Sequence, residues 1–203
     1  MNEEIRHVMK VAERPSVVMA KGEGSWLWDA QGKRYLDFVQ GWAVNSLGHS
    51  SPIVLDALSA QAGRLINCSP AYYNEPMARL STLVATTTGL ADVYLCNSGA
   101  EANEGAIKLA RKWGARHRNG AFEIITMDHG FHGRTLATMA ASGKPGWDAL
   151  FEPKVPGFKK VSFADLEAVK QAVTPATVAV MQLLARKVMP KFGKHAAATP
   201  PRV

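Results

Sequence analysis

The segment best suited to chemistry is residues 98–101, Ser-Gly-Ala-Glu. A serine followed three residues later by a glutamate, here Ser98 and Glu101, is the capping-box pattern that starts a helix. Gly99 lets the backbone approach a ligand closely, and the N–H groups of Gly99, Ala100 and Glu101 are expected to point out of the positive helix end. Such an end can hold a phosphate group, although the same pattern also begins many plain surface helices.

The residues behind this segment are expected to form a stable helix over 101–113. Acidic side chains lie near its start and basic ones near its end, which matches the helix macrodipole. Glu104 and Lys108 are also spaced for an ion pair on one helix face. The cap and the charge pattern therefore account for the helix without a ligand. The spacing of Ser98 and Glu101 alone does not decide whether a phosphate binds there.

A second candidate segment is residues 128–135, Asp-His-Gly-Phe-His-Gly-Arg-Thr. Taken alone, Phe131 is typical of a core residue, and Arg134 of a solvated or ion-paired base. His129 and His132 have a spacing that could suggest a metal site, but no cluster of carboxylates or thiols accompanies them. The sequence therefore predicts no metal site and gives the two histidines turn or supporting roles.

The elements that position these segments follow a regular order. Aromatic-rich runs on either side of Gln31-Gly32 predict a β-hairpin in a small N-terminal α+β subdomain, followed by helices over 53–65 and 75–87. Strands are then expected to alternate with helices, which predicts an α/β fold with a mostly parallel sheet and helices on both faces. The expected strands are 92–96, 122–127 and 177–181, and the expected helices are 101–113, 135–141 and 165–172.

Composition and charge divide the chain further. Residues 1–70 are assigned to the small subdomain, 71–182 to part of a large domain, and 183–203 to a basic tail, expected to be disordered. The tail carries five of the seven net positive charges, and it lacks the interleaved aromatic residues expected of a nucleic-acid-binding segment. The two cysteines suggest no disulfide framework. With no secretory signal and no apolar run that could span a bilayer, we expect a cytoplasmic protein.

Four segments in order resemble hallmarks of class III aminotransferases, in the manner of the acetylornithine branch. They are 44–49 (Val-Asn-Ser-Leu-Gly-His), 67–76 (Asn-Cys-Ser-Pro-Ala-Tyr-Tyr-Asn-Glu-Pro), 97–104 (Asn-Ser-Gly-Ala-Glu-Ala-Asn-Glu) and 128–135. The resemblance covers about residues 15–181 and implies a fold-type-I architecture that binds pyridoxal 5'-phosphate. It further implies that Ser98, Gly99 and Ala100 bind the cofactor phosphate, that Phe131 stacks on the pyridine ring, and that Arg134 binds the substrate carboxylate.

The resemblance also implies a reaction and what this chain lacks for it. Relatives move an amino group between N-acetylornithine and 2-oxoglutarate in arginine biosynthesis, and they act as homodimers. Alternatives are an enzyme acting on ornithine, succinylornithine or 4-aminobutyrate, or a non-catalytic cofactor-binding or interaction fragment. The lysine that forms a Schiff base lies beyond the third strand in the family, and no lysine here has that context. We therefore expect a truncated, inactive chain with an incomplete sheet, no catalytic residue and weak cofactor binding.

Overall fold

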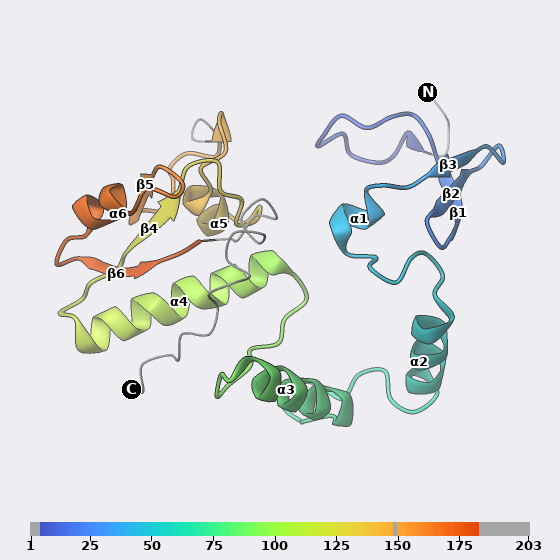
Figure 1. The fold of residues 1–203 in the computed structure, drawn as a ribbon, viewed down its shortest axis with the longest axis horizontal. Helices are drawn as coiled ribbons and strands as arrows, with labels where there is room; N and C mark the ends of the chain where they lie inside the picture. Colours follow the sequence, from blue (N-terminus) through green and yellow to red (C-terminus); the bar gives the residue numbers. More distant parts are fainter. Residues whose placement is uncertain (1–4, 148–149, 183–203) are drawn as a thin grey trace. The chain divides into compact units, whose positions relative to one another are not determined.

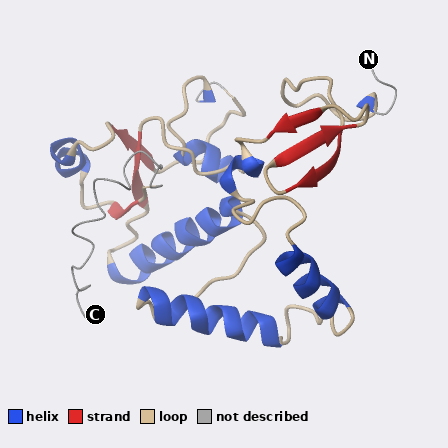
Figure 2. Cartoon of the chain, turned by 45° about the vertical axis from the view of Figure 1, so that its right-hand side comes forward, coloured by secondary structure: helices blue, strands red, loops and turns tan. Residues whose placement is uncertain are grey.

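The structure is a computed structural model, in which residues 5–147 and 150–182 are described. The chain divides into two compact units, Met1–Asn74 and Glu75–Val203, and each is described by itself. Figure 1 shows the course of the chain, and Figure 2 shows its helices and strands by colour. The boundary between the units falls four residues after the one expected at residue 70. The basic tail lies outside the described residues.

The first unit is built on an antiparallel sheet of three strands, β1 (Met19–Glu23), β2 (Trp26–Asp29) and β3 (Arg34–Leu36), in that order. The predicted hairpin is confirmed, and Asp29 closes its turn. The Asp29 carboxylate accepts hydrogen bonds from the N–H groups of Gln31 and Lys33 at 3.0 and 2.9 Å, and from the Tyr35 hydroxyl at 2.8 Å. These donors lower the pKa of Asp29, the Tyr35 hydroxyl most of all.

A single turn, α1 (Gln40–Ala43), and a regular helix, α2 (Pro52–Ala62), follow the sheet. The α1 turn is left-handed, because φ is positive at all four of its residues. The predicted helix at 53–65 is confirmed as α2, which begins with proline as expected and ends three residues early. Asp37 and His49 join this region to the sheet through a hydrogen bond of 2.7 Å between Oδ2 and Nε2.

The second unit contains a three-stranded parallel sheet with the order β5-β4-β6. Its strands are β4 (Glu123–Met127), β5 (Phe158–Val161) and β6 (Thr177–Val180), and its helices are α3 (Glu75–Thr88), α4 (Gly99–His117), α5 (Leu136–Ala141) and α6 (Leu166–Ala172). The predicted α/β class and the mostly parallel sheet are confirmed. Figure 1 shows α4 beside β6 and α6 beside β5.

The core of the second unit lies around β4. Ile125 and Met127 share one face of the strand and pack, with Val161, against the partly buried Ala168, Val169 and Ala172 of α6. Ile124 and Thr126 point to the other face and are also fully buried. Side chains on both faces of β4 are therefore buried, as the prediction of helices on both sides of the sheet requires for its central strand.

One predicted strand is wrong, and two strands were not predicted. Residues 92–96 form an irregular segment, in which Tyr94 is 66% exposed. A strand requires a hydrogen-bonding partner, and no described strand pairs with this segment. The unpredicted strands are β1 and β5. Neither carries the apolar run or the strict alternation by which a strand is recognised, since both contain lysine and β1 also contains glycine.

Candidate cofactor site

The first turn of α4 is capped as the sequence predicts, with one difference. Ser98 is the N-cap residue, and its hydroxyl accepts a hydrogen bond of 3.2 Å from the N–H of Glu101. The Glu101 carboxylate reaches one residue further back than in a standard capping box and accepts from the N–H of Asn97 at 2.6 Å. The N–H of Glu101 is therefore occupied, contrary to the expectation of three free donors.

Two donors remain at this helix end. The N–H groups of Gly99 and Ala100 have no hydrogen-bond partner among the described residues. A Cβ added at Gly99 would meet no heavy atom within 4 Å, so the backbone lies open at this point. Two free amides at the positive end of a long helix form a site that suits a phosphate group.

Glu101 keeps its negative charge at this helix end. The N–H of Asn97 is the largest cause that lowers the pKa of the Glu101 carboxyl, and the Asn97 and Ser98 side chains also contribute. The capping interaction is therefore present above the ordinary pKa of a glutamate and is lost as the pH falls through the lowered value. The cap that Glu101 forms is thus complete at neutral pH.

The loop at 128–135 lies directly against the first turns of α4. The Asn103 side chain donates to the carbonyl of His132 at 2.6 Å, and the Thr135 hydroxyl donates to the Glu104 carboxylate. Between these two contacts, a Cβ added at Gly133 would lie only 2.8 Å from Ala100 Cβ. The fold therefore brings together two segments that the sequence proposed separately, the helix end and the loop that carries Phe131 and Arg134.

These contacts involve residues to which the sequence reasoning gave no role. In the described structure the Glu104 carboxylate accepts from Thr135 and does not form the expected ion pair with Lys108. Asn103 and Glu104 belong to the quoted motif, but helical spacing cannot show that they hold a loop 29 and 31 residues further along the chain. The only sequence signal for such a contact would be a polar side chain on the face of the capped helix that is turned toward the core.

Phe131 and Arg134 both lie on the surface of this loop. Phe131 is 44% exposed, so the core role that its residue type suggests is wrong. Arg134 is exposed and forms neither an ion pair nor a hydrogen bond with any of the described residues. Thr135 then caps α5 through a reciprocal pair of hydrogen bonds with Thr138, which fixes the end of the loop next to Arg134.

The two histidines of the loop have different environments. His129 is exposed and has a φ of +59°, in agreement with its predicted turn role. His132 is only 2% exposed, and neither ring nitrogen has a hydrogen-bond partner in the described structure. Burial lowers the pKa of the His132 imidazole, because the protonated ring would have to leave water. His132 is therefore neutral at physiological pH.

This burial makes the loop sensitive to acid. The unfolded chain binds a proton at His132 near the ordinary histidine pKa of about 6.5, whereas the folded chain binds it only at lower pH. We expect the urea midpoint for unfolding of the second unit to fall as the pH drops from 7.5 to 5. The urea midpoint of a His132→Phe variant should fall less over the same pH range. Equal pH dependence in the two proteins would contradict this role of His132.

Three lysines of the second unit make contacts in or near the sheet. Lys159 pairs with Glu123 at 2.7 Å, Lys160 donates to the carbonyl of Ala140 at 3.0 Å, and Lys170 pairs with Glu167 at 2.7 Å. In the part of the chain that the structure describes, no three His, Cys, Asp or Glu side chains are grouped as a metal ion would need. None of the described helices is long and apolar enough to cross a membrane.

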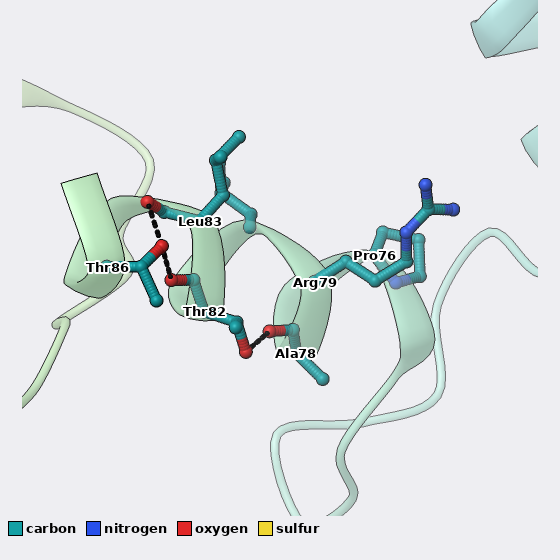
Figure 3. A pocket seen from close by; sticks show the side chains of 7 residues that line it. Pro76, Ala78, Arg79, Thr82, Leu83 and Thr86 are labelled. Carbon is teal, nitrogen blue, oxygen red and sulfur yellow. Dashed lines mark hydrogen bonds between the residues drawn. The ribbon is translucent and has the colours of Figure 1, made fainter.

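A groove of about 760 Å³ lies along α3, away from these contacts. Figure 3 shows that its wall is a single helix, with Arg79 at one end and the hydroxyls of Thr82 and Thr86 bonded back to helix carbonyls. Its lining residues all lie between 76 and 86, and none belongs to the segments 97–104 and 128–135 that form the candidate site. The groove therefore takes no part in the candidate site.

Comparisons with known proteins find relatives over most of the chain. The family model described as aminotransferase class III matches residues 8–198. An acetylornithine aminotransferase from Ralstonia nicotianae is 59% identical over 181 residues, which cover 87% of this chain and 45% of the relative. The chain thus spans slightly less than half the length of the curated relatives that it matches.

Solved structures give the same result. The ornithine aminotransferase of Toxoplasma gondii superimposes with a TM-score of 0.82 at 32% identity, covering 88% of this chain and 43% of that structure. N-acetylornithine aminotransferase from Stenotrophomonas maltophilia gives a TM-score of 0.68 at 34% identity, over 83% of this chain and 42% of that one. The family match over most of the sequence, together with these structures, shows that the chain belongs to the class III aminotransferases, which depend on pyridoxal phosphate.

Proposed function

We propose that this chain contributes the phosphate-binding and carboxylate-binding half of an acetylornithine aminotransferase-like site. The observation that carries the proposal is the contact of Ala100 with Gly133, which joins the open end of α4 to the loop bearing Phe131 and Arg134. N-acetylornithine and 2-oxoglutarate are the proposed substrates of the whole enzyme, and both carry the carboxylate that an arginine fork would bind.

The residues present fit pyridoxal phosphate. The free N–H groups of Gly99 and Ala100 would hold its phosphate together with Ser98, and the exposed side of Phe131 would lie against its ring. When bound in this family, the cofactor supplies an electron sink for amino-group transfer. The residues of this chain would bind and orient it, and Arg134 would orient the substrate by its carboxylate.

Assembly as a homodimer is proposed from the family resemblance. An ornithine-type substrate is a second candidate, because the Toxoplasma gondii structure that superimposes well is an ornithine aminotransferase. Titrations of the cofactor-loaded chain with N-acetylornithine and with ornithine would compare its affinities for the two candidate substrates.

Removing one amide of the phosphate site provides the main test. Gly99 is the first residue of α4, where proline is well tolerated, and Ser98 before it has the extended backbone that proline requires. A Gly99→Pro variant therefore loses the donor without losing the helix. We expect its affinity for pyridoxal phosphate, measured by equilibrium dialysis, to fall about tenfold or more, since a hydrogen bond to a charged group contributes about 1.5–3 kcal/mol.

Gly99→Ala is the matched control. It keeps the N–H, and its new Cβ would meet nothing within 4 Å, so its affinity should stay close to that of the wild type. Inorganic phosphate should compete with the cofactor in the wild type. Equal affinities in the proline and alanine variants, or cofactor binding that phosphate does not reduce, would contradict the proposed site.

A further inference from the structure

Trp147 lies beside the residue proposed to hold the cofactor ring, although no motif includes it. Its indole contacts Phe131 edge to face, with ring centroids 5.7 Å apart and planes at 68°. Lys144 Nζ also lies 5.0 Å from the centroid of the Trp147 ring. Trp147 itself is only partly exposed. Partial burial and the contact with Lys144 therefore restrict the indole that contacts Phe131.

The same indole also borders α5. Trp147 lines a small cavity of about 10 Å³ together with Leu136, Met139 and Ala140 of this helix. Helix α5 begins two residues after Arg134 and is capped by Thr135. Trp147 thus contacts Phe131 and shares a cavity with the helix that follows Arg134, and Phe131 and Arg134 are the side chains proposed to bind the cofactor ring and the substrate.

A phenylalanine that is 44% exposed would turn among several rotamers unless a neighbour restricted it. Aromatic side chains prefer the edge-to-face geometry that Trp147 and Phe131 adopt, and this contact favours one orientation of the Phe131 ring. A ring already oriented binds a flat partner more tightly, because less freedom is lost on binding.

We propose that Trp147 is a positioning residue that sets the orientation of Phe131 for the cofactor ring. This inference rests on the proposed function, since it assumes that Phe131 stacks on pyridoxal phosphate. It predicts that Trp147 affects the binding of the ring and leaves the binding of the phosphate unchanged. The phosphate donors lie on α4 and do not touch the indole in any described contact.

The first measurement needs no cofactor. The chain is labelled with 4-fluorophenylalanine, and the fluorine resonance of Phe131, one of seven phenylalanines, is assigned with a Phe131→Leu variant. Trp147→Leu should shift and narrow this resonance because the ring gains freedom, whereas Trp147→Phe keeps an aromatic edge and should largely restore it. Trp113→Leu removes an indole from α4 and is the control, which should leave the Phe131 resonance unchanged.

The second measurement compares two ligands. We expect Trp147→Leu to weaken the binding of pyridoxal phosphate about twofold to tenfold, the range that one edge-to-face contact gives. Its affinity for inorganic phosphate should equal that of the wild type, which also shows that the variant is folded. An unchanged Phe131 resonance in Trp147→Leu would overturn the proposal. An equal loss of affinity for pyridoxal phosphate and for inorganic phosphate would also overturn it. If the wild type does not bind pyridoxal phosphate, the proposed function fails, and the fluorine resonance still decides whether Trp147 orients Phe131.

Discussion

Replacing Gly114 by alanine should destabilise the second unit more than any other single methyl group added to α4. The new Cβ would lie 1.9 Å from the carbonyl oxygen of Ala121 and 2.9 Å from Val178 Cγ2. Ala121 is buried just before β4, and Val178 belongs to β6, so neither can move without shifting the sheet. Such overpacking costs about 3 kcal/mol or more when backbone atoms must move.

Gly105→Ala is the control for this prediction within the same helix. Its Cβ would meet the ring of Tyr94 at 2.9 Å, but this ring is 66% exposed and can turn away. Alanine also favours a helix over glycine by about 1 kcal/mol, so this variant should be neutral or slightly more stable. Urea unfolding followed by circular dichroism measures both proteins. If Gly114→Ala lost no more stability than Gly105→Ala, the close packing of α4 on β6 would be wrong.

The elements predicted correctly from the sequence are those whose own residues determine them. Helix α4 has a serine cap and an ordered pattern of charges, and β4 is an apolar run buried on both faces. The hairpin between β2 and β3 has aromatic strands on either side of a turn with glycine at φ +82°. In each case, local propensity and the final packing favour the same structure.

The errors occur where a distant partner decides the structure. Residues 92–96 look like a buried strand, but a strand exists only when another strand pairs with it. Strand β5 reads Phe-Lys-Lys-Val and is selected by its parallel pairing with β4, which brings Lys159 to Glu123. The left-handed turn α1 contains Gln40, Trp42 and Ala43 at positive φ, a conformation for which their residue types give no signal.

The candidate site also contains features that local sequence determines and features that depend on distant partners. The capping serine and the glycine of α4 were recognisable, because they act within one turn of helix. The hydrogen bond from Asn103 to the His132 carbonyl and the contact of Trp147 with Phe131 join residues 29 and 16 positions apart. No periodicity connects such pairs, so only the fold reveals that they hold the loop in place.

Gly133 lies against Ala100 of α4, and a methyl group there should separate the loop from the helix. A Cβ would lie 2.7 Å from the Thr138 hydroxyl and 2.8 Å from Ala100 Cβ, at a residue whose φ of +136° already disfavours any side chain. We expect Gly133→Ala to lower the free energy of unfolding by about 2–4 kcal/mol through strain and overlap. It should also weaken the binding of pyridoxal phosphate at least tenfold, since Ala100 and Arg134 would no longer be held together.

Gly120→Ala separates these two causes. Gly120 also has a positive φ, of +84°, but a Cβ there would meet nothing within 4 Å. This variant therefore carries the backbone strain alone, about 1–2 kcal/mol, and should bind the cofactor like the wild type. Equilibrium dialysis of the three proteins, at a temperature where all are folded, measures the binding. Equal affinities in Gly133→Ala and Gly120→Ala would mean that the contact with Ala100 does not hold the site together, because only Gly133 lies against the helix end that binds the phosphate.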